Sequence, residues 1–123
     1  MRTVWTGRVL SAIPVLMLLF SASVKFMRTP AVVQGFAQYG FPDRMILVIA
    51  IIELGCVVVY LIPRTAVLGA ILMTGLLGGA TVTNLRVGDP LYFVPVVLGI
   101  LAWAGLFLRD SRLRALIPLR KVD

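Results

Sequence analysis

The sequence predicts an all-α integral membrane protein, an antiparallel bundle of four transmembrane helices with a short interfacial helix between the first and second spans. Of its 123 residues, 60% are apolar and only 14% are charged, whereas a soluble domain carries about 45–50% and about 25%. Four apolar segments, 9–26, 45–62, 66–85 and 91–108, are each long enough to cross a hydrocarbon core about 30 Å thick. They do not alternate apolar and polar residues, as membrane strands do. An ordinary soluble domain and a disordered chain are both excluded.

The first span has basic residues before it. Arg2 and Arg8 precede the apolar run, which ends in a small-residue stretch at 21–23 that is similar to a signal-peptidase site. We expect the segment to be retained as a span. The whole chain, 1–123, is then a single four-span membrane domain.

The connection between the first two spans, residues 27–44, has the signals of a helix of its own. Thr29 is placed as an N-cap, Pro30 follows at the first helical position, and Gly40 is a C-terminal stop. These signals favour a short helix lying in the membrane interface. An irregular loop is the alternative.

The other two connections are tight. Pro63, Arg64 and Thr65 alone join the second span to the third, and 86–90, with Gly-Asp-Pro turn chemistry, joins the third to the fourth. Connections this short make consecutive spans antiparallel neighbours.

The net charge of +7 is interpreted as membrane topology rather than nucleic-acid binding, because the basic residues lie between and after the apolar runs. The positive-inside rule places both termini in the cytoplasm of a bacterial-type inner membrane. The basic tail at 109–121 is either a contact for anionic lipid or simply solvated. On the cytoplasmic side lie Arg2, Arg8, Arg64, Arg109, Arg112, Arg114, Arg120 and Lys121, and on the other side Lys25, Arg28, Arg44 and Arg86.

Several kinds of site are excluded by composition. The chain has one cysteine, Cys56, and no histidine. An intrachain disulfide, a zinc site and a histidine-ligated haem therefore lack their residues. We expect no metal site, and no cofactor is evident apart from a quinone.

Glu53 is the residue most indicative of function, because it lies in the middle of the second apolar segment. A charged group at that depth costs at least about 2.5–3.5 kcal/mol and marks a functional site by default. The alternative is a neutral carboxyl group that only bonds a neighbouring helix.

Helical spacing places other polar residues beside Glu53, along a track from the non-cytoplasmic side. We expect hydroxyls or water to bridge Lys25 and Glu53, with snorkelling of Lys25 to the headgroups as the alternative. Glycines of the third and fourth spans are expected to let helices pack closely within the bundle or in a homodimer. Each of the first three spans has one stripe of residues at helical spacing: Ser21, Lys25 and Arg28; Ile49, Glu53, Cys56 and Tyr60; and Thr74, Gly78, Thr81 and Asn84. The glycines expected to pack closely are Gly75, Gly78, Gly79, Gly99 and Gly105.

The chain resembles the DoxX-like family over about residues 9–118. The resemblance rests on Phe-Ser-Ala-Ser-Val-Lys-Phe at 20–26, Glu-Leu-Gly at 53–55, Pro-Arg-Thr-Ala at 63–66 and Arg-Val-Gly-Asp-Pro at 86–90. It implies a four-span bundle in a family named for its similarity to a membrane subunit of thiosulfate:quinone oxidoreductase. It also implies a site made of Lys25, Glu53 and Asn84. Related members often have histidine at the position of Asn84, so no proton relay or metal role is carried over with it.

Four functions are compatible with these residues. The first is a quinone-interacting subunit of a membrane redox complex, which works with a redox partner protein. The second is a proton-coupled exporter of lipophilic compounds, the third an enzyme that uses Glu53 as a general acid on a lipophilic substrate, and the fourth a non-catalytic assembly factor. In the catalytic hypotheses Lys25 and Asn84 act beside Glu53, and the candidate substrate-binding residues are Ser21, Thr74, Thr81 and Arg86.

Overall fold

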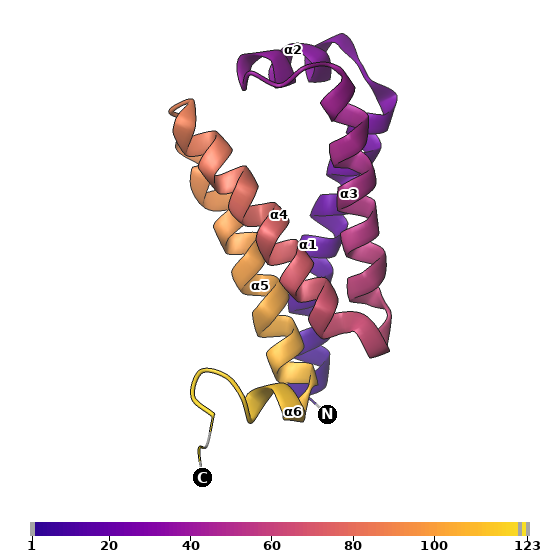
Figure 1. Cartoon of the computed structure of the whole chain (residues 1–123). Helices are drawn as coiled ribbons and strands as arrows, with labels where there is room; N and C mark the ends of the chain where they lie inside the picture. Colours follow the sequence, from indigo (N-terminus) through magenta and orange to yellow (C-terminus); the bar gives the residue numbers. More distant parts are fainter. Residues whose placement is uncertain (1, 121, 123) are drawn as a thin grey trace.

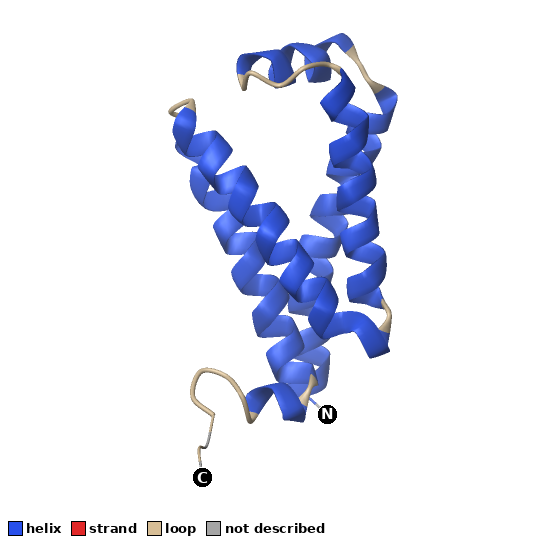
Figure 2. Cartoon of the chain, viewed as in Figure 1, coloured by secondary structure: helices blue, strands red, loops and turns tan. Residues whose placement is uncertain are grey.

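The computed structural model describes residues 2–120 and 122, and this part of the chain is helical, without strands (Figure 2). Over this part, four helices are long and apolar enough to cross a membrane. The predicted all-α four-span fold is therefore confirmed. The spans centre on α1 (Arg2–Met27), α3 (Arg44–Leu61), α4 (Ala66–Arg86) and α5 (Phe93–Arg109).

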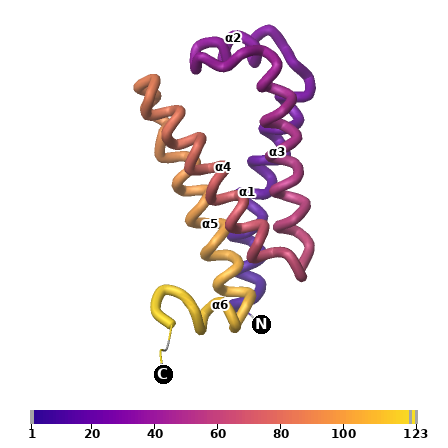
Figure 3. Tube along the Cα trace, in the orientation of Figure 1, coloured from indigo at the N-terminus to yellow at the C-terminus, as the bar shows by residue number. Residues whose placement is uncertain are grey.

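The spans are arranged as two pairs that diverge. α1 packs against α3 and α5, and α4 packs against the same two helices. Near the chain termini the α1–α3 pair and the α4–α5 pair lie together, and they spread apart toward the opposite end (Figures 1 and 3). We call these the closed end and the open end. The turn η1 (Pro63–Thr65) lies at the closed end, and η2 (Pro90–Tyr92) lies at the open end.

The helix bounds differ from the predicted ones mainly at the start of the chain. α1 begins at Arg2 rather than near residue 9 and continues through Pro14. The first turns are helical because Gly7 and Ser11 are buried against α5. The other spans agree with the prediction to within a few residues. A short helix that was not predicted, α6 (Ser111–Arg114), begins after Asp110, whose carboxylate accepts a hydrogen bond from the Arg112 backbone N–H.

The predicted short helix in the first connection is present as α2 (Pro30–Gln38). Its N-cap is Thr29, whose hydroxyl accepts a hydrogen bond from the Val32 backbone N–H at 3.4 Å. Gly40, with φ +83°, follows its end, a conformation that glycine adopts without strain. α2 lies across the open end of the bundle (Figure 1) and has no fully buried residue. Its location in a membrane interface stays a prediction.

Glycines hold the closed end together, and the prediction of close helix packing is confirmed for Gly105 among them. A Cβ on Gly105 would lie 2.7 Å from the Gly7 carbonyl oxygen of α1, and a Cβ on Gly69 would lie 2.3 Å from the Tyr60 Cα of α3. By contrast, the prediction that the cluster Gly75, Gly78 and Gly79 packs between helices of the bundle is wrong, because nothing lies within 4 Å of a Cβ built at these positions. Their neighbours are the two cavities described below.

Candidate functional site

A cavity of about 560 Å³ lies toward the open end, between the two helix pairs and beneath residues 30–43, which we call the α2 segment. This volume is in the range of small-molecule sites in proteins. Its walls are mostly apolar and come from all four spans, with Phe36 and Phe41 added from the α2 segment. The polar residues that line it are Ser21, Lys25, Tyr39, Glu53, Thr83 and Asn84.

A buried ion pair forms the polar end of this cavity. Glu53 lies in the middle of α3, and the residue is 5% exposed. Its Oε1 lies 2.7 Å from the Lys25 Nζ of α1. The Ser21 hydroxyl, one helical turn before Lys25, accepts a hydrogen bond from Nζ and donates one to Oε1 at 3.4 Å.

The expectation that only hydroxyls or water connect Lys25 and Glu53 is therefore wrong. The pair is direct, and the serine hydroxyl adds a second connection. The physical reason is the length and direction of the lysine side chain, which extends toward the amino end of its helix and reaches the depth of Ser21. Its ammonium group lies inside the bundle and does not snorkel outward. The next residue of the predicted stripe, Arg28, instead pairs with Asp43 outside the cavity.

The second carboxylate oxygen of Glu53, Oε2, is buried and has no hydrogen-bond partner among the residues that the structure describes. Buried polar atoms are nearly always hydrogen-bonded, so an exception needs an explanation. Glu53 lines the cavity, and its buried Oε2 has a hydrogen-bonding capacity that the protein leaves unused. Among residues 2–120 and 122, no group of three acidic, cysteine or histidine side chains is placed to hold a metal ion.

The α2 segment closes the open end through aromatic and polar contacts. The Lys25 ammonium lies 5.8 Å from the centre of the Phe36 ring, a cation–π contact. The Tyr39 hydroxyl donates a hydrogen bond to the Asp89 carboxylate at 2.5 Å, and the Arg86 guanidinium donates one to the Tyr39 carbonyl oxygen. Arg86 does not line the cavity, and its contact instead ties the α2 segment to the end of α4.

The hydrogen bond between Tyr39 and Asp89 shifts both ionisations. It raises the pKa of the Tyr39 phenol, and partial burial adds to the effect. It also lowers the pKa of Asp89, with a further contribution from the Leu91 backbone N–H that the carboxylate accepts. Both groups lie in the connections outside the spans.

One face of α4 supplies polar residues to the cavity, but only one of them was predicted. Asn84 lines the cavity as expected. Thr83 lies beside it and was missed, because the predicted stripe followed the neighbouring face of the helix. Its hydroxyl donates to the Gly79 carbonyl oxygen at 2.8 Å. The spacing of Gly75, Gly79 and Thr83, each four residues apart, is the pattern that identifies this face.

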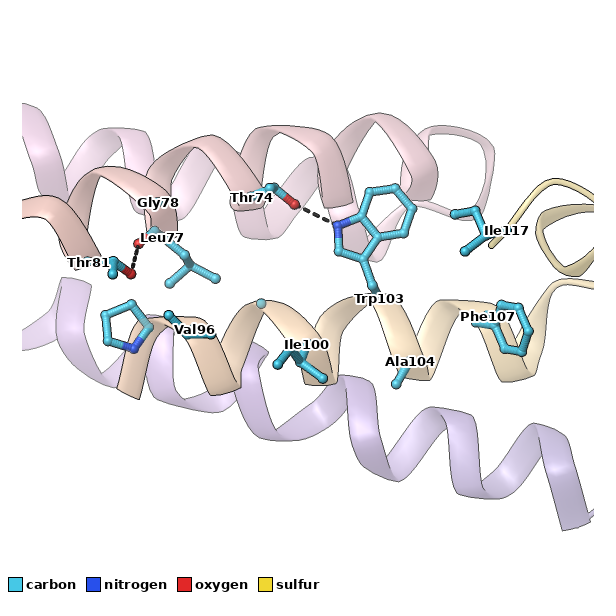
Figure 4. A pocket seen from close by; sticks show the side chains of 12 residues that line it. Thr74, Leu77, Gly78, Thr81, Val96, Ile100, Trp103, Ala104, Phe107 and Ile117 are labelled. Atoms are coloured by element: carbon cyan, nitrogen blue, oxygen red, sulfur yellow. Dashed lines mark hydrogen bonds between the residues drawn. The ribbon is translucent and has the colours of Figure 1, made fainter. Parts of the chain in front are cut away.

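Thr74 and Thr81 do not reach Glu53, which corrects the expectation that they belong to one polar track with it. Both line a separate groove of about 540 Å³ between α4 and α5 (Figure 4). Thr74 accepts a hydrogen bond from the Trp103 indole N–H at 2.6 Å, and Thr81 donates to the Leu77 carbonyl oxygen at 2.9 Å. Local acceptors of this kind satisfy threonine hydroxyls in a membrane helix without a polar cavity.

Two further residues of the predicted stripe on α3 belong to other surroundings. Cys56 is buried in the apolar core. Tyr60 lies at the closed end, where its hydroxyl bonds with Ser11 at 2.8 Å and donates to the Ala102 carbonyl oxygen at 2.7 Å. The Arg109 guanidinium also donates to Ser11, at 3.1 Å. This second polar cluster fastens α1, α3 and α5 together.

The sequence profile of the DoxX-like family matches residues 9–105, a range that includes the ion pair and Asn84. No curated protein and no solved structure matches the chain.

Proposed function

Since the chain belongs to the DoxX-like family of small integral membrane proteins, we propose that its open-end cavity binds the headgroup of a membrane quinone, as a quinone-interacting subunit of a redox complex. One observation carries the proposal. The buried Glu53 carboxylate has one oxygen in an ion pair and the other without a partner, and it lines a cavity in the membrane-spanning part of the bundle.

The cavity suits a molecule with a small polar ring and a long apolar tail. Its walls are mostly apolar, and its polar groups lie at Glu53 and along the last turns of α4. Such a molecule dissolves in the bilayer, so it reaches the gap between the diverging helix pairs from the lipid phase. The Asn84 amide and the remaining N–H bond of Lys25 are donors for ring oxygens.

The proposed roles divide between proton and electron chemistry. Glu53 exchanges a proton with the bound ring oxygen, while Lys25 and Asn84 polarise it. Ser21 fixes the ion pair by its two hydrogen bonds. With no histidine and a single cysteine, the chain offers few side chains for a redox centre of its own. A partner protein therefore supplies the electrons in this proposal.

Export of lipophilic cations is less well supported. Exchange of a proton against a cation requires a carboxylate that the substrate can occupy. Here the Lys25 ammonium already pairs with Glu53 at 2.7 Å, so a cationic substrate would have to displace it.

We also propose that both termini face the cytoplasm. Apart from Lys121, which lies outside the described residues, the basic residues of the termini and of η1 lie at the closed end, and Lys25, Arg28, Arg44 and Arg86 lie toward the open end. The positive-inside rule then gives the orientation. Single cysteines introduced by Thr3→Cys and Gly40→Cys, labelled with an impermeant maleimide in right-side-out vesicles, test it: labelling at position 3 would reverse the assignment.

Two leucine variants test the binding site. Gly79 lines the cavity and Gly78 lines the other groove, and nothing lies within 4 Å of a Cβ at either position. Gly79→Leu therefore fills the cavity, while Gly78→Leu is a control on the same helix. The ligand is a benzoquinone with a decyl tail, titrated in both redox forms against the protein in lipid nanodiscs.

We expect saturable binding to the wild type and to Gly78→Leu, and a loss of at least about tenfold in affinity for Gly79→Leu, which is about 1.4 kcal/mol. Rates of quinone reduction in membranes that carry each variant should follow the same order. If the wild type binds neither redox form saturably, the proposed function is wrong.

A further inference from the structure

The hydrogen-bonding capacity around Glu53 shows which ligand groups the cavity accepts. Oε1 receives Lys25 and Ser21, while Oε2 receives nothing. Of the three N–H bonds on the Lys25 ammonium, one points to Oε1 and one to Ser21, which leaves one donor. The pair thus has an unpaired acceptor and one N–H bond that neither Oε1 nor Ser21 receives, on two groups joined at Oε1.

We infer that the cavity selects a ligand with a hydroxyl donor, so that it binds the hydroquinone form of the carrier more tightly than the quinone form. The inference rests on the proposed function and specifies the redox state that the site prefers. A hydroxyl group donates its proton to Oε2 and accepts the remaining N–H of Lys25. One oxygen of the ligand therefore satisfies both partners of the ion pair.

A quinone carbonyl oxygen cannot do this, because it is an acceptor only. It bonds to Lys25, but it leaves Oε2 unpaired and brings the partly negative carbonyl oxygen close to the carboxylate in an apolar cavity. Leaving a charged acceptor unsatisfied costs more than an ordinary hydrogen bond contributes. The carboxylate, in its ion pair with Lys25, is thus the group that discriminates between the two redox states.

The other polar residues of the cavity discriminate less. The Asn84 side chain has both donors and an acceptor, so it serves a carbonyl and a hydroxyl equally well. The Thr83 and Tyr39 hydroxyls already donate, to the Gly79 carbonyl oxygen and to Asp89, and are left as neutral acceptors. A charged acceptor forms the stronger hydrogen bond, so the preference depends mainly on Glu53.

Three ligands that differ only at the ring oxygens test this inference on the wild-type chain in nanodiscs. They are a decyl benzoquinone, its hydroquinone kept reduced under argon, and the dimethyl ether of that hydroquinone. The quinone and the ether both lack a donor, and one is smaller and the other larger than the hydroquinone. Size alone therefore cannot make the hydroquinone the tightest ligand.

We expect the hydroquinone to bind at least about tenfold more tightly than either of the others, as for one hydrogen bond to a charged acceptor. In Glu53→Gln the difference between hydroquinone and quinone should fall to within about threefold, because an amide both donates and accepts. Asn84→Leu should weaken all three ligands by a similar factor and keep the preference.

The outcomes separate the two proposals. Saturable binding of all three ligands with equal affinity, or tighter binding of the quinone, overturns the donor preference and leaves the quinone site standing. Absence of saturable binding by every ligand overturns the proposed function and this inference with it. Because the ligand comparison uses the unaltered protein, it does not depend on whether Glu53→Gln folds.

Discussion

Replacing Gly69 by alanine tests the closed-end packing on which the shape of the bundle depends. Gly69 lies in the first turn of α4, directly against α3. A Cβ at this position would lie 2.3 Å from the Tyr60 Cα and 2.4 Å from its backbone nitrogen. These are backbone atoms, so no side-chain rotation relieves the contact. To restore ordinary contact distances, α3 and α4 must separate locally by about 1 Å.

The steric cost follows from comparison with a second glycine of the same helix. Overpacking of this kind costs about 1–3 kcal/mol. Glycine to alanine in a helix also gains up to about 1 kcal/mol of helix propensity. Gly75→Ala has the same gain and no steric cost, because nothing lies within 4 Å of its Cβ. The difference between the two variants is therefore the steric cost alone.

The free energy of unfolding is measured in mixed micelles with increasing sodium dodecyl sulfate. We expect Gly75→Ala to be as stable as the wild type or more stable, and Gly69→Ala to be less stable than Gly75→Ala by about 1–3 kcal/mol. Displacement of Tyr60 also strains its hydrogen bonds to α1 and α5, which places the expected value in the upper half of this range. Equal stability of the two variants would refute the close approach of α3 and α4.

Two further predictions concern single hydrogen bonds. The hydrogen bond between Tyr39 and Asp89 lowers the pKa of Asp89 and raises the pKa of Tyr39. The stability that this bond adds to the folded protein is therefore lost as pH falls through the lowered pKa of Asp89. It is also lost as pH rises through the raised pKa of Tyr39. The loss of stability in Tyr39→Phe should be largest near neutral pH and vanish at both extremes. In this variant the pKa of Asp89, measured by carboxyl-carbon NMR, should rise toward its ordinary value. An unchanged pKa of Asp89 would contradict the contact. Thr74→Val removes the hydroxyl that accepts a hydrogen bond from the Trp103 indole. It should lower the free energy of unfolding by about 0.6 kcal/mol, typical of hydrogen bonds between membrane helices, and shift the NMR signal of the indole proton upfield. An unshifted signal would argue against that bond.

The spans were predictable because their determinants are local. Length, apolar content and the absence of alternation fix four helices, and the three-residue turn at 63–65 fixes two of them as antiparallel neighbours. The ends of α2 could be predicted from the sequence for the same reason, since Thr29 and Gly40 act within one helical turn. The early start of α1 could not be predicted. It depends on Gly7 and Ser11 fitting against α5, which lies nearly a hundred residues further along the chain.

The candidate site was predictable in its centre and not at its edges. Glu53, Lys25 and Ser21 were identifiable because charge and hydroxyl groups are costly inside an apolar segment, and their spacing placed two of them on one face. Which face of α4 they meet depends on the rotation of that helix about its axis. The threonine stripe suggested one rotation, and the close contact at Gly69 sets another. The contact of Tyr39 with Asp89 joins two connections that the sequence does not relate.

The position of the cavity follows from where the glycines are used. At the closed end Gly7, Gly69 and Gly105 bring helix backbones into contact, so the two pairs are held close at that point and diverge beyond it. Farther along α4, Gly75 and Gly79 face space rather than another helix, which leaves the α4 wall of the cavity without side chains at these two positions. The same residue type thus closes one end of the bundle and leaves room at the other. The ion pair of Glu53 lies where the two pairs widen, and in the proposed function a ligand in that space supplies the hydrogen bond that its second oxygen lacks.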